Sequence, residues 1–178
     1  PRLSYTANEM ILPRKRTAAD MESVISTGYV DNVANTIIIA PLTEKQVCLN
    51  GASTTGGAAN KSHRPAHALL IADNGAALDG DVAAQVGLNT YWAVSVTRAR
   101  ADILGCTNGT ASLTYTRLTY TNPTRFGNGA NYVFADMHAK FSPLERTLDP
   151  NNFQWGTRAY TAGGAQVMKA GTTNVPVQ

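Results

Sequence analysis

One segment near the C-terminal end of the chain, residues 131–141, constrains the fold more than any other. Tyr132 and Phe134 stand two positions apart, as side chains on one face of a strand do. A largely polar step over residues 136–138 separates this run from a second apolar stretch. Two such runs joined by a short polar step are typical of a β-hairpin. We therefore predict a hairpin over residues 131–141 with its turn at Asp136 and Met137.

Three other segments predict strands. Residues 36–40 are short, apolar and β-branched, which suits a buried strand, and Pro41 ends the run. Residues 68–72 have a similar apolar character and precede an Asp-Asn-Gly turn signal at 73–75. Residues 112–121 alternate apolar side chains with threonines, which indicates a further strand.

Residues 79–104 form the one stretch that predicts a long helix. Asp81 is placed to cap it, and apolar residues such as Val82 and Val86 recur loosely at helical spacing. A brief helical turn is expected at 18–25. Together with the strands, these segments predict an α+β fold. In this fold an antiparallel sheet carrying the C-terminal hairpin packs against helical material, with long loops outside.

The length of 178 residues fits one domain with a substantial core. We place this globular domain at residues 1–161. The Gly- and Thr-rich remainder, 162–178, is expected to be a C-terminal extension that is either exposed or ordered only against a neighbour. Residues 50–61 consist of loop-forming residue types and predict a surface loop.

The composition favours a protein that works outside the cell and does not bind nucleic acid. Charged residues make up 15% of the chain, against roughly 25% in soluble domains, and threonine is abundant, which indicates a Thr-rich β surface. The formal net charge is +3. Basic residues cluster only at 14–16 and at Arg98 and Arg100, without interleaved aromatic residues. No apolar run reaches the ~20 residues of a membrane span.

Four residues are candidates for covalent modification. Cys48 and Cys106 lie far apart, each beside turn-forming residues. An even cysteine count in a surface-like composition favours one disulfide, with two buried free thiols as the alternative. Closing so long a loop would stabilise the fold by roughly 4 kcal/mol. Asn60 and Asn108 begin Asn-x-Ser/Thr tripeptides on expected loops and are candidate glycosylation sites.

An acidic cluster is the best candidate for metal binding. Asp73, Asp79 and Asp81 lie in a glycine-containing segment that offers the oxygen ligands calcium uses. Their spacing departs from that of an EF-hand loop. We therefore expect no bound metal or cofactor, with calcium at these carboxylates as the alternative, and Asp136 is expected to accept hydrogen bonds from turn amides instead.

Catalytic motifs are missing from the sequence. His63 and His67 have the separation of a zinc pair on a helix, but Pro65 between them argues against a helix. There is no Gly-x-Ser-x-Gly, no phosphate-binding Gly-rich loop and no His-Glu-x-x-His. We therefore expect a protein that is not an enzyme.

The hairpin segment carries a more specific pattern. It resembles the C-terminal signature of the type IV pilin and pseudopilin-like family, whose members carry a prepilin-type cleavage and methylation segment. That signature is close to Arg-His-x-x-Gly-x-Asn-x-x-Phe-x-Asp-Gly-His. The sequence departs from it at Phe126, where the signature has histidine, and at Met137, where it has glycine. The positions that match it at the same spacing are Arg125, Gly129, Asn131, Phe134, Asp136 and His138.

The resemblance implies a pilin-like globular head and a role in a filament. Family members begin with a charged leader and a long apolar helix that holds the subunit in the membrane and then in the filament core. No such helix is present in the 178 residues. We expect that it either precedes them in a longer chain or is supplied by a separate small pilin chain.

The expected function is that of a structural subunit in an extracellular, cell-surface filament, of the type IV pilus or type II secretion pseudopilus kind. Its partners would be copies of itself in a helical array. The alternative is a minor pseudopilin or surface adhesion module that recognises a ligand through the loops at 50–61 and 73–81. Such a module would require a concave aromatic site.

Overall fold

The computed structural model describes residues 4–8, 10–12, 25–44, 66–67, 70–72, 91–107, 121–160, 164–172 and 174–178. Within them, the chain forms two sheets, two α-helices and two short 3₁₀ turns, η1 (Thr27–Tyr29) and η2 (Val33–Asn35). Neither α-helix of this part of the chain is long and apolar enough to cross a membrane.

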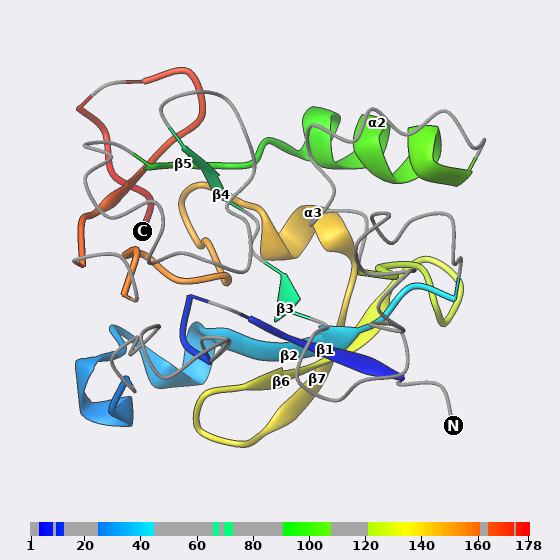
Figure 1. The fold of residues 1–178 in the computed structure, drawn as a ribbon, viewed down its shortest axis with the longest axis horizontal. Coiled ribbons are helices and arrows are strands. Elements are labelled where there is room, and N and C mark those ends of the chain that lie inside the picture. Colours follow the sequence, from blue (N-terminus) through cyan, green and yellow to red (C-terminus); the bar gives the residue numbers. More distant parts are fainter. Residues whose placement is uncertain are drawn as a thin grey trace, which may run out of the picture.

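The larger sheet contains five strands, which lie side by side in the order β3-β1-β2-β6-β7 (Figure 1). The pairs β1–β2, β2–β6 and β6–β7 are antiparallel, and β3 runs parallel to β1. The register between β2 and β6 shifts by one residue near Ile39, which is the mark of a β-bulge. The bounds are β1 Tyr5–Asn8, β2 Ile37–Pro41, β3 Ala66–His67, β6 Ala130–Phe134 and β7 Ala139–Ser142.

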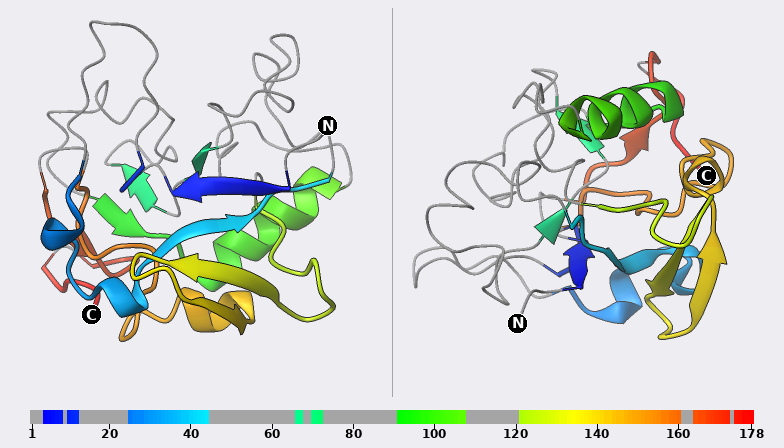
Figure 2. Two further views of the ribbon diagram at one scale, coloured as in Figure 1. Left: turned by 90° about the horizontal axis from the view of Figure 1, so that it is seen from below. Right: turned by 90° about the vertical axis from the view of Figure 1, so that its right-hand side faces the viewer.

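The smaller sheet has β5 (Tyr91–Ala93) at its centre. It pairs antiparallel with β4 (Leu70–Ala72) and parallel with β8 (Val167–Met168). The helices α2 (Val96–Thr107) and α3 (Leu144–Thr147) lie on one side of the larger sheet, with α3 nearer to it (Figures 1 and 2). The α+β fold and the largely antiparallel sheet are confirmed.

One hydrophobic core connects the two sheets and the C-terminal segment. Strand β2 is buried along most of its length, which confirms the buried strand predicted at 36–40. Tyr132 and Trp155 meet edge to face in this core, with ring centroids 5.6 Å apart. The largest fully buried side chains are Met10, Ile37, Tyr91, Tyr132, Phe134, Phe153 and Trp155.

The helix predicted over 79–104 is wrong at its start. Residues 91–93 form β5, which pairs with strands on both sides, and Tyr91 is fully buried in the hydrophobic core. The helix begins only at Val96, where the Ser95 hydroxyl accepts a hydrogen bond from the Arg98 amide and so caps the first turn. Asp81, the expected cap, lies outside the described residues. At residues 91–93, pairing with strands that are distant in the sequence outweighs the local helical spacing of apolar residues.

The segment expected as a C-terminal extension contributes to the core instead. Val167 and Val177 are buried in the same cluster as the residues of the larger sheet. The last residue, Gln178, accepts a hydrogen bond from the Phe153 amide at 2.7 Å. The described part of 162–178 therefore packs within the domain, because β8 pairs with β5 and two of its valines, Val167 and Val177, are buried.

The side chain of Asn8 joins three parts of the chain. It is fully buried, and its Nδ2 donates to the carbonyl oxygens of Ile37 at 2.8 Å and Trp155 at 3.1 Å. Its Oδ1 accepts from the Met10 amide at 3.1 Å. A buried polar group of this kind contributes stability only while all its partners are in place.

We predict that Asn8→Ala lowers the free energy of unfolding by about 2–4 kcal/mol, because it leaves two buried carbonyls and one amide without their partner. Denaturant unfolding of the purified chain measures the change. The matched control is Asn131→Ala, on exposed β6 surface, which should change stability by less than about 0.5 kcal/mol. An equal loss in both variants would contradict this role of Asn8.

Candidate functional site

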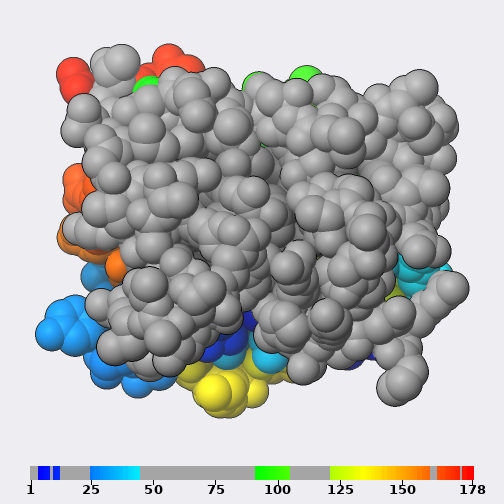
Figure 3. All heavy atoms as spheres, in the orientation of Figure 1, coloured from blue at the N-terminus to red at the C-terminus, as the bar shows by residue number. Residues whose placement is uncertain are grey.

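The turn of the β6–β7 hairpin has the geometry of a three-residue loop. The Met137 amide donates to the Phe134 carbonyl, and the Phe134 amide donates to the His138 carbonyl, both at 2.9 Å. Met137 has φ 71°, the left-handed conformation that ends such loops. The hairpin and its turn at Asp136 and Met137 are therefore confirmed. The tip stands at the lower rim of the molecule in Figure 3.

The tip is held together by Asp136 and His138. Asp136 Oδ1 accepts from the His138 amide at 3.2 Å and lies 2.5 Å from its ring Nδ1. The His138 ring stacks on Phe134, with centroids 4.4 Å apart and planes within 5° of parallel. The side-chain hydrogen bond with His138 lowers the pKa of Asp136 below its ordinary value, and the backbone hydrogen bond adds to the effect.

The base of the hairpin has no room for a side chain at Gly129. A Cβ placed there would lie 2.6 Å from Cζ of Phe141 and 2.8 Å from the Ser142 carbonyl oxygen. Glycine is therefore required for the chain to enter β6 at this point. By contrast, Asn131 on β6 is exposed, and its side chain makes no hydrogen bond among the described residues.

Arg125 ties the chain before the hairpin to the end of β2. Its Nη1 donates to the Leu42 carbonyl at 3.3 Å, and its Nη2 lies 3.2 Å from Glu44 Oε1. The Asn122 amide also donates to the Pro41 carbonyl at 2.8 Å. The structure thus brings all six signature positions onto one hairpin and its approach, where five of them have a visible structural role and Asn131 does not.

The two departures from the signature both lie on the surface. Phe126 is 49% exposed and Met137 is 73% exposed. The Phe126 amide donates to the Gly129 carbonyl at 3.1 Å, so the backbone of Phe126 lies beside the base of the hairpin. Neither change disturbs the core, and only Met137 carries a backbone conformation that favours glycine.

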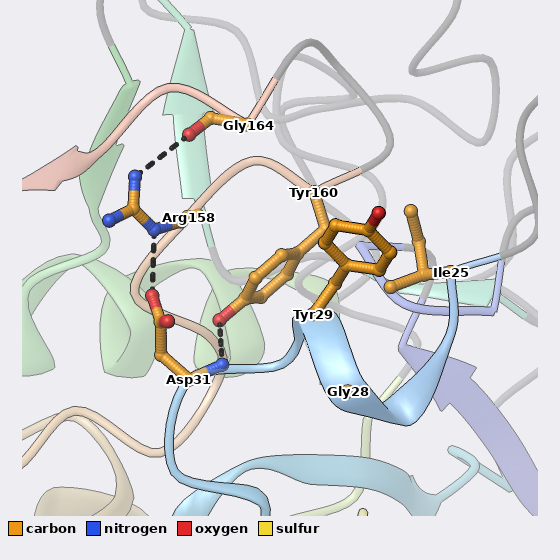
Figure 4. Close-up of a pocket in the computed structure, with 7 residues that line it drawn as sticks. All are labelled: Ile25, Gly28, Tyr29, Asp31, Arg158, Tyr160 and Gly164. Atoms are coloured by element: carbon orange, nitrogen blue, oxygen red, sulfur yellow. Dashed lines mark hydrogen bonds and ion pairs between the residues drawn. The ribbon is translucent and has the colours of Figure 1, made fainter.

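A second feature, which the sequence did not predict, is a hollow of about 510 Å³ between η1 and the segment 157–160 (Figure 4). Arg158 Nε donates to Asp31 Oδ2 at 2.7 Å, and the Asp31 amide donates to the Tyr160 hydroxyl at 3.0 Å. Asp31 and Arg158 are 127 positions apart, so no local pattern in the sequence could have linked them. The hollow is lined by Ile25, Gly28, Tyr29, Asp31, Arg158, Tyr160 and Gly164.

Most other predicted site residues fall outside the part of the chain that the structure describes. This holds for the candidate calcium ligands, for Cys48 and for both glycosylation candidates. Cys106 lies in α2, where only its backbone is described. Among the described residues, no group of three or more His, Cys, Asp or Glu side chains could hold a metal ion. The residues left outside are Cys48, Asn60, Asp73, Asp79, Asp81 and Asn108.

Comparison of the chain with protein-family models, with curated proteins and with solved structures finds no match. The resemblance to the pilin-like signature therefore stays a prediction that rests on the residue types and spacing of the hairpin segment.

We predict that Met137→Gly raises the free energy of unfolding by about 0.5–1 kcal/mol. The left-handed conformation costs a residue with a Cβ about 1–2 kcal/mol, and the greater freedom of glycine in the unfolded chain offsets part of that gain. Thermal or denaturant unfolding measures the difference. Met137→Ala, which keeps the Cβ, is the control and should give no gain. A loss of stability in Met137→Gly would contradict the assigned turn.

We predict that the Asp136 carboxyl titrates below pH 3.8, its ordinary pKa, in an NMR titration of the folded protein. Because the folded-state pKa is lowered, the contact with His138 stabilises the hairpin above the ordinary pKa. This contribution is lost as the pH falls through the lowered pKa. In His138→Ala the pKa of Asp136 should rise towards 3.8. An Asp136 that titrates at or above this value in the unmodified chain would refute the contact.

Proposed function

We propose that this chain is the globular head of a structural subunit in an extracellular filament of the type IV pilin or pseudopilin kind. The observation that carries the proposal is the β6–β7 hairpin. Five of the six matching signature residues meet a structural demand of this hairpin or its approach, and the backbone at Met137 favours the glycine of the signature.

Three positions illustrate this demand. Gly129 has no space for a Cβ, Asp136 bonds the turn amide that follows it, and Met137 has the left-handed conformation that glycine, the residue of the signature, adopts at least cost. The residue types of the signature can therefore be explained by the steric, hydrogen-bonding and backbone needs of one tight hairpin. This supports assigning the chain to proteins that share that hairpin.

A filament subunit needs repeated surface contacts more than it needs reactive groups. In a helical array these contacts are heterologous, so two different surfaces of each head meet. Strand β7 is the last strand of the larger sheet and lies at its outer edge (Figure 2). Phe126 and Phe141, 49% and 47% exposed, lie beside the base of the same hairpin. We call β7 with these two side chains the hairpin edge.

The hairpin edge is the surface we assign to one side of the subunit contact. Among the described residues no strand pairs with the outer side of β7, and two half-exposed aromatic side chains accompany it. Free strand backbone and aromatic side chains are both buried in stable protein contacts. Lys140 lies on the same strand and is exposed; a charge of this kind protects an edge strand from unspecific pairing.

The remaining parts of the proposal follow from the family resemblance. The partners are copies of this chain, together with an apolar helix from a preceding segment of the same protein or from a separate small chain. The head lies at the cell surface and performs no catalytic step. The loops that would serve the alternative, an adhesion module, fall at 50–61 and 73–81, which lie outside the described residues.

We predict that Phe126→Glu strongly reduces the number of filaments on the cells that produce this protein. Burial of a phenylalanine side chain contributes about 2 kcal/mol, and in a helical array the loss repeats at every subunit. Electron microscopy with antibodies against the head counts the filaments. Thermal unfolding of the purified head shows whether the variant folds, which we expect because Phe126 is half exposed.

The matched control is Tyr5→Glu, which introduces the same charge at an aromatic residue of similar exposure, 47%, on a strand far from the hairpin edge in the sheet order. Filament numbers should remain close to those of the unmodified protein. Normal assembly of Phe126→Glu would show that the hairpin edge is not a subunit contact.

A further inference from the structure

The hollow between η1 and the segment 157–160 is held in shape by hydrogen bonds. Asp31 Oδ2 accepts from Arg158 Nε at 2.7 Å and from the Thr157 hydroxyl at 3.2 Å. The Tyr160 hydroxyl accepts from the Asp31 amide at 3.0 Å, and Arg158 Nη1 donates to the Gly164 carbonyl at 3.4 Å. The wall residues are therefore ordered before any ligand arrives, which reduces the entropy cost of binding.

Two tyrosines give the hollow aromatic surface (Figure 4). Tyr160 is buried except for a small part, whereas Tyr29 is 77% exposed. Tyr29 lies in η1, whose N-cap Ser26 accepts a hydrogen bond from the Gly28 amide, so the turn that presents the ring is itself fixed. An exposed ring at the mouth of an ordered hollow offers a flat apolar surface to a ligand.

The polar groups of the hollow carry opposite charges that are already paired. The side chains of Asp31 and Arg158 are 51% and 41% exposed, so both reach solvent. Among the described residues, Asp31 Oδ1 and Arg158 Nη2 take part in no hydrogen bond. The ion pair between Asp31 and Arg158 thus keeps one acceptor atom and one donor atom for a ligand, and the pair carries no net charge.

The exposed tyrosine ring and the ion pair without net charge together indicate which class of ligand the hollow can bind. An anion would meet the Asp31 carboxylate and a cation the Arg158 guanidinium, while an apolar molecule would desolvate the ion pair without replacing its hydrogen bonds. A neutral ligand with one flat C–H face and adjacent hydroxyls satisfies both the ring and the pair, since each hydroxyl can donate and accept. A sugar in its pyranose form has these properties.

We propose that this hollow is a binding site for a neutral saccharide, in which a pyranose ring packs on Tyr29 and adjacent hydroxyls bond Asp31 and Arg158. The volume of about 510 Å³ lies within the ~300–1,000 Å³ of small-molecule sites. This activity goes beyond a structural role in a filament. It is independent of whether the head assembles, because the site and the hairpin edge share no residue.

The test is a titration of the purified 178-residue chain with maltotetraose, cellotetraose and N-acetylchitotetraose, followed by NMR. At least one of these neutral probes should bind with a Kd below about 10 mM. Tyr29→Ala should weaken that binding by about tenfold or more, whereas Tyr29→Phe, which keeps the ring, should retain most of it. Asp31→Asn and Arg158→Gln should each weaken binding as well.

Tyr5→Ala, at an exposed tyrosine outside the hollow, is the control and should bind as the unmodified chain does. The charged sugar tetragalacturonate should bind more weakly than the best neutral probe. The proposal is overturned if no neutral probe binds by about 10 mM, if Tyr29→Ala binds as well as the control, or if the charged probe is preferred. Tyr29 is exposed, so unfolding of the variant does not obscure the result.

Discussion

The side-chain amide of Asn8 connects the larger sheet to the C-terminal part of the chain. It lies at the end of β1 and bonds the carbonyls of Ile37 in β2 and Trp155. The neighbouring backbone bond from the Ile37 amide to the Gln154 carbonyl, at 2.7 Å, reinforces this junction. Because the amide is fully buried, losing any one partner would leave polar groups without water or protein to bond.

The hairpin depends on that junction through the core. Trp155, held by Asn8, packs edge to face on Tyr132 of β6, and β6 in turn pairs with β2 on one side and β7 on the other. The tip and the base of the hairpin then add local constraints of their own, at Asp136 and Gly129. Among the described residues no strand pairs with the outer side of β7, and this free edge is the physical basis on which we propose a role in assembly.

Structural features that depend on residues close together in the sequence could be predicted. Features that depend on contacts between distant residues could not. The alternation at Tyr132 and Phe134 and the polar step after them were sufficient for the hairpin, because a turn and its flanking strands are local. The strand at Tyr91 was missed because its partners in β4 and β8 are remote in sequence. The hollow was missed for the same reason, since Asp31 and Arg158 come from opposite ends of the chain.

Cryo-electron microscopy of native filaments from the cells that produce this protein tests the central claim most directly. We expect a helical core of apolar helices surrounded by head density that fits the larger sheet and its β6–β7 hairpin, with the hairpin edge against a neighbouring head. If the native protein is instead a monomer with no helix or filament attached, the filament assignment is contradicted.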